Sequence, residues 1–123
     1  MDELIARVVA ATGLDADTAA KAVGLVLAFL KKEGPAEQVG DIIASMPGAD
    51  ALAAGAGRSS GGTFAMLPGG GLMQLAGELT GLGIGMDQMR GVGQEIFGFA
   101  KEKVGEDEVG TVVGAIPGLA GFL

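Results

Sequence analysis

Cysteine and histidine are both missing from this chain of 123 residues. Without cysteine it has no disulfide framework, no thiolate nucleophile and no cysteine-based metal site. Without histidine it lacks the commonest metal ligand and the usual general base. We therefore expect no metal site, no cofactor and no enzymatic activity.

The remaining reactive side chains form no catalytic pattern. The serines are Ser45, Ser59 and Ser60, and none has a histidine to activate it. The run Glu106-Asp107-Glu108 could hold a divalent cation weakly, but three acids at a helix start more commonly complement the helix dipole. The glycine-rich segment 81–86 ends in methionine where a dinucleotide fingerprint needs glycine or alanine. An enzyme using Asp or Glu alone would need two carboxylates facing each other in a cleft.

Basic residues are scarce, with 8 Lys and Arg against 15 Asp and Glu, and the formal net charge is −7. Binding to a nucleic-acid backbone needs a basic surface, so nucleic acid is not an expected partner. The same charge disfavours docking on anionic lipid.

Long apolar runs are also absent, because no window reaches 18 uninterrupted apolar residues. The run Leu25 to Leu30 ends at Lys31-Lys32-Glu33, so we expect no membrane-spanning helix. Asp2 and Glu3 stand where a secretory signal would carry basic residues. We expect a cytoplasmic protein.

One stretch of the chain occurs twice. Residues 39–48 (VGDIIASMPG) return 70 positions later as residues 109–118 (VGTVVGAIPG), without a gap. The repeat predicts two related halves: an N-terminal helical repeat over 1–54, a glycine-rich linker over 55–71 and a C-terminal helical repeat over 72–123.

Apolar spacing predicts helices in both halves. In the first half we expect helices over about 3–12, from a cap at Asp15 to Gly34-Pro35, and from Pro35 to Met46, with Asp50 capping a short turn. In the second half we expect helices from Leu72 to Thr80-Gly81, from about Met86 to Gly105, and from there to Ile116. The second-half glycine matched to Gly13 is expected to be Gly81. The predicted fold is all-α: each half contributes three to four short helices, packed together as one small bundle.

Glycine is abundant, at 24 residues, and several glycines fall inside the predicted helices. Each costs about 1 kcal/mol relative to alanine, so these helices need tertiary support. Gly77 and Gly81 lie four residues apart, as do Gly110, Gly114 and Gly118, and each set would leave a smooth groove. We expect such grooves to pack closely between the halves or between protomers; membrane insertion is the less favoured alternative.

The linker contains the apolar segment Phe64-Ala65-Met66-Leu67, which packs on the core or docks on a partner or membrane surface. This segment, the second copy of the repeat and the apolar C-terminal tail supply the candidate interface. Its residues are Phe64, Met66, Leu67, Gly110, Gly114, Gly118 and Phe122.

In its repeat the chain resembles an uncharacterised bacterial family of small glycine-rich helical proteins labelled VcgC/VcgE-like. Its first residues, Met1 to Asp15, also look like the start of related bacterial helical domains of unknown function. The resemblance implies an all-α bacterial protein, and it implies no activity and no catalytic residues.

Together these observations predict a non-enzymatic helical module that binds protein, most simply itself as a homo-oligomer. The alternative is a helical protein that binds an apolar ligand or a membrane surface. The six methionines fit a core-filling role better than a binding surface.

Overall fold

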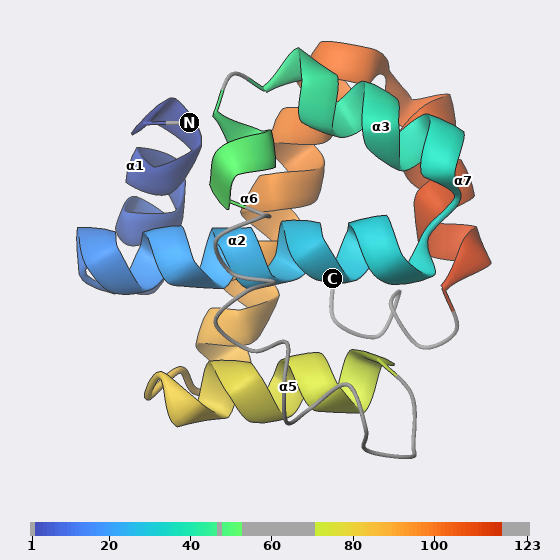
Figure 1. Ribbon diagram of the computed structural model, residues 1–123. Coiled ribbons are helices and arrows are strands. Elements are labelled where there is room, and N and C mark those ends of the chain that lie inside the picture. The colour runs from blue at the N-terminus through green and yellow to red at the C-terminus, as the bar shows by residue number, and fades with distance from the viewer. Residues whose placement is uncertain (1, 47, 53–70, 117–123) are drawn as a thin grey trace.

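The protein is all helical (Figure 1). In this computed structural model, residues 2–46, 48–52 and 71–116 are described. They form α1 (Asp2–Thr12), α2 (Ala16–Glu33), α3 (Ala36–Ser45), α5 (Gly71–Gly81), α6 (Met86–Val104) and α7 (Glu106–Ala115). A short helical turn over residues 49–52 follows α3. No strand occurs within the described ranges, so the predicted fold class is confirmed.

The apolar faces expected from the sequence are the faces that the fold buries. On α3, the side chains spaced i, i+3, i+4 and i+7 are all less than a tenth exposed: Val39, Ile42, Ile43 and Met46. On α6, five apolar side chains are buried as well: Met89, Val92, Ile96, Phe97 and Ala100. Removing these side chains from water is the main favourable contribution to folding.

The helix packing joins the two halves in one core. Helices α2 and α6 cross near the centre, with α1 packed on α6 and α5 packed on α2 (Figure 1). The first helix of each predicted half therefore contacts the second helix of the other half. Helices α3 and α7 contact each other, and α3 also contacts both α2 and α6. The predicted domain boundaries at 54 and 72 stay a prediction.

Helix bounds in the two halves are closely matched. Helices α3 and α7 begin at residues 36 and 106 and end at residues 45 and 115, so both ends are 70 positions apart. The residues that follow them, Met46 and Ile116, have nearly equal backbone angles, and each donates its N–H to the carbonyl three residues earlier. These parallels support the predicted repeat, which remains a prediction.

Two helix ends differ from the sequence expectation. Gly83, with φ of 86°, holds the left-handed position that corresponds to Gly13, with φ of 75°; Gly81 is instead the last residue of α5. The expected match between Gly81 and Gly13 is therefore wrong, because the matching residue is Gly83, which lies 70 positions after Gly13. Asp15 is at the N-cap of α2 as predicted, but its side chain makes no capping hydrogen bond.

A hydrogen bond from the Gln88 side chain links the C-terminal end of α1 to α6. The Gln88 side chain accepts a hydrogen bond from the Gly85 N–H (2.9 Å) and donates one to the Thr12 carbonyl (3.1 Å). A Cβ atom at Gly91 would lie 2.7 Å from Thr12 Cγ2, so glycine is needed where the helices meet. At the other end of the contact, Arg7 pairs with Glu102 at 2.6 Å and lies over the Phe99 ring.

Candidate functional site

The structure describes two of the seven residues of the candidate interface. Gly110 and Gly114 are both exposed on α7, and a Cβ atom on either would meet nothing within 4 Å. The other five lie outside the described residues: Phe64, Met66, Leu67, Gly118 and Phe122. The candidate interface therefore stays a prediction.

Close packing at the glycine pairs is not found between the described helices. Gly77 and Gly81 are exposed with open space around them, as are Gly110 and Gly114. The close approach between the halves occurs at Gly91, where Thr12 of α1 meets α6. Spacing identified glycines that share a helix face, but whether that face is covered depends on the tertiary fold.

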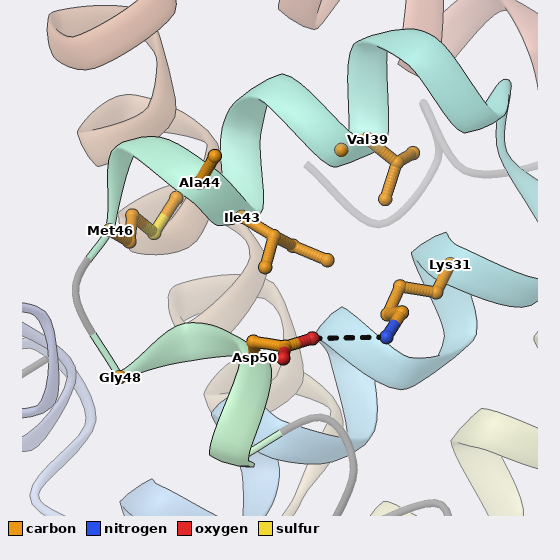
Figure 2. A pocket seen from close by; sticks show the side chains of 8 residues that line it. Lys31, Val39, Ile43, Ala44, Met46, Gly48 and Asp50 are labelled. Carbon is orange, nitrogen blue, oxygen red and sulfur yellow. Dashed lines mark hydrogen bonds and ion pairs between the residues drawn. The ribbon is translucent and has the colours of Figure 1, made fainter.

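A groove lies beside the first copy of the repeat, between α2, α3 and the turn at 49–52 (Figure 2). Its volume is about 540 Å³. We call it the α3 groove, and its lining residues are Lys31, Val39, Gly40, Ile43, Ala44, Met46, Gly48 and Asp50. Six of these eight residues belong to the repeated stretch 39–48.

Local chain geometry produces this groove. On the solvent side of α3, Gly40 and Ala44 are too small to fill the space, while Ile43 points from α3 toward α2 and the turn (Figure 2). After α3 ends, Gly48 adopts a φ of 89°, a conformation that favours glycine. The chain then turns back and buries Ala49 completely.

One ion pair crosses the α3 groove. Lys31 Nζ, near the end of α2, lies 3.2 Å from Asp50 Oδ1 on the turn (Figure 2). Asp50 was expected to cap the turn, and it makes this contact instead. The two side chains are 47% and 79% exposed, so the pair adds at most about 1 kcal/mol to stability. A ligand could displace it at small cost.

The sequence placed the interface on the second copy of the repeat, whereas the groove borders the first. The predicted residues Gly110, Gly114 and Gly118 are 70 positions after the groove residues Gly40, Ala44 and Gly48. The predicted residues are therefore the repeat equivalents of three groove residues, and the predicted interface stays a prediction. Lys31 and Asp50 were missed because they lie outside the stretch, and only the fold brings them to its edge.

Acidic side chains surround α3 and α7. Glu37 and Asp41 are on α3, Glu106, Asp107 and Glu108 begin α7, and neither helix carries a lysine or arginine. Glu108 lies near Asp41 across the α3–α7 contact, and its Oε2 atom is buried without a hydrogen-bond partner. Burial of this carboxyl, followed by the charge of Asp41, raises the pKa of Glu108 above its usual value of 4.5.

Asp41 and Glu108 are not two carboxylates that face each other in a cleft, which is the arrangement that an enzyme using Asp or Glu alone would need. Asp41 is exposed and Glu108 is half-buried, and neither lines the α3 groove. Ser45 donates its hydroxyl to the Ile42 carbonyl at 2.7 Å. Within the described part of the chain, no three acidic side chains converge to hold a metal ion.

None of the described helices is both long enough and apolar enough to cross a membrane.

Comparison of the chain with protein-family models, with curated proteins and with solved structures gave no match. The resemblance to the VcgC/VcgE-like family stays a prediction, and the candidate site rests on the geometry of the α3 groove.

Proposed function

We propose that this protein is a non-enzymatic helical interaction module that receives an apolar part of a partner protein in the α3 groove. The observation that supports this function best is a preformed groove of about 540 Å³ with an apolar floor, crossed by a weak ion pair. An apolar lining with a few polar groups at its edge is the usual composition of a binding site. The proposal keeps the cytoplasmic location expected from the sequence.

The remaining described surface offers little apolar area for association. Among the described residues, Met86 is the large apolar side chain that is mainly exposed, at 66%. An interface without a groove would need a wider apolar patch.

The test places a photo-reactive benzoylphenylalanine at position 44, at the edge of the groove, in protein expressed in its native cells. We expect one cross-linked partner, identified by mass spectrometry, and loss of that cross-link when Gly40→Leu fills the groove. Position 77 is the matched control, because Gly77 is exposed on α5 and has open space around it.

The same label at position 110 tests the interface predicted from the sequence. Cross-linking at 110 but not at 44 would move the contact to α7. The proposal would be contradicted if cross-linking were equally strong from positions 44 and 77 and if Gly40→Leu did not change it. A cross-link between two copies would identify self-association, and analytical ultracentrifugation would give its stoichiometry.

A second candidate function is binding of a small apolar ligand, and the groove volume favours it. Ligand sites commonly enclose about 300–1,000 Å³, and the α3 groove falls in that range. Native mass spectrometry of protein purified from cells should then show an added mass that Gly40→Leu removes and Gly77→Leu does not. No added mass under gentle conditions would count against this candidate.

A further inference from the structure

The solvent side of α3 next to the groove is acidic and smooth. Glu37, Gly40, Asp41 and Ala44 are all exposed, and their spacing of three and four residues makes them neighbours on the helix surface. We call these four residues the α3 outer face. Two carry negative charge, and the other two carry no side chain or a single methyl group, so a partner can approach the α3 backbone closely.

Negative charge continues on both sides of this face. Asp50 lies across the groove, and the exposed Glu106 and Asp107 begin the neighbouring α7. Within the described part of the chain, every lysine and arginine lies on α1, α2 or α6: Arg7, Lys21, Lys31, Lys32, Arg90, Lys101 and Lys103. The groove edge has one of these cations, Lys31, and Asp50 already neutralises it.

We propose that the α3 groove and the α3 outer face bind a basic amphipathic segment of another protein. Apolar side chains of the segment enter the groove beside Ile43 and Met46, and its lysines or arginines lie over Glu37 and Asp41. This inference rests on the function proposed above and adds the chemistry of the partner. Apolar anchors give such a contact its affinity, and complementary charge gives it speed and selectivity.

Charge argues against the other occupants of this surface. A second copy would bring the same net charge of −7 and the same acidic outer face, so the two surfaces would repel each other. Anionic lipid and nucleic-acid backbones would be repelled for the same reason. A basic amphipathic segment supplies positive charge opposite the acidic α3 outer face and apolar side chains for the groove.

The first experiment measures binding of two synthetic fluorescent peptides by anisotropy. One has leucines at helical i, i+3, i+4, i+7 spacing with lysines elsewhere, and the other has glutamates in place of the lysines. We expect the lysine peptide to bind at least about tenfold more tightly, with an affinity that falls as salt is raised.

Variants then locate the site. Gly40→Leu blocks the groove and should weaken binding of the lysine peptide at least about tenfold, whereas Gly77→Leu, at an equally open position on α5, should not change it. Glu37→Gln with Asp41→Asn should weaken binding by about tenfold at low salt. Glu3→Gln with Asp87→Asn removes the same charge from exposed positions on α1 and α6 and is the matched control. Circular-dichroism melting confirms that each variant is folded.

The outcomes separate the inference from the function it rests on. Equal binding of both peptides, binding of neither, or equal loss in groove and control variants would overturn the basic-segment inference. If cross-linking at position 44 still identifies a partner that depends on the groove, the interaction function survives with a partner of different chemistry. If that cross-link joins two copies, the occupant is a second copy and the inference is wrong. If no groove-dependent cross-link forms, the function itself fails.

Discussion

Helices α3 and α7 have matching bounds and similar buried faces, yet α3 borders the groove and α7 does not line it. Their residues differ on the buried side, where Ile42 corresponds to Val112, and also on the side that faces away from the core. Gln38, Asp41 and Ala44 of α3 correspond to Glu108, Thr111 and Gly114 of α7. Across the groove, Asp50 corresponds to Ala120. Gly40 and Gly48 of the proposed site recur unchanged in the second copy, whereas Asp41, Ala44 and Asp50 do not.

The largest expected effect tests whether the two copies contribute equally to the core. Ile42 and Val112 are both completely buried and differ by one methylene group. Truncation leaves an unfilled cavity, so Ile42→Ala should lower the free energy of unfolding by about 3 kcal/mol and Val112→Ala by about 2. Urea denaturation measures both. A cost below about 0.5 kcal/mol for Val112→Ala would show that α7 is held far more loosely than α3.

The next effect compares a covered glycine with an open one. Gly91→Ala should destabilise the fold by about 1–3 kcal/mol, because the new Cβ atom meets Thr12 Cγ2 at 2.7 Å. Gly114→Ala should stabilise it by about 1 kcal/mol, because alanine favours the helix and the Cβ has open space. Thermal melting shows whether each substitution raises or lowers the stability of the fold. If Gly114→Ala is destabilising, α7 packs against something at that position.

A pH effect distinguishes α7 from α3, because Glu108 stands where α3 has Gln38. The pKa of Glu108 is raised in the folded protein, so the folded state binds the proton more tightly than the unfolded state. This group's contribution is therefore fully present below pH 4.5 and is lost as pH rises through the folded pKa.

Glu108→Gln removes the loss of folding stability that the ionisation of Glu108 causes. It should raise the melting temperature at pH 7, and the gain relative to the parent should shrink toward pH 4. Glu106→Gln, an exposed position in the same turn, controls for the change in net charge. A gain that is equal at both pH values, or equal in the control, would show that the buried carboxyl is not its cause.

The smallest effect concerns the ion pair across the groove. Asp50→Ala gives the first copy the alanine of the second, at position 120, and leaves Lys31 without this contact. Both side chains are well exposed, so a double-mutant cycle with Lys31→Met should give a coupling energy below about 1 kcal/mol. Stronger coupling would mean that the pair closes the groove rather than yielding to a ligand.

The sequence by itself determined which side chains are buried and where most helices begin and end. The i, i+3, i+4, i+7 patterns around Val39 and Val109 fix the apolar face of each helix, because helical geometry is local. It placed the candidate interface at Gly110 and Gly114 and did not identify Gly40 or Ala44 as groove residues. It did not predict that Gly83, and not Gly81, takes the left-handed turn.

Only the tertiary structure decided which helices meet. An apolar stripe specifies the buried face of a helix and not the partner that covers it, so the packing of α1 on α6 and α5 on α2 could not be deduced. The same reason explains why Gly91 is crowded and Gly114 is open. The α3 groove depends on Lys31 and Asp50, which are 19 residues apart and meet because the turn at Gly48 brings the chain back beside α2.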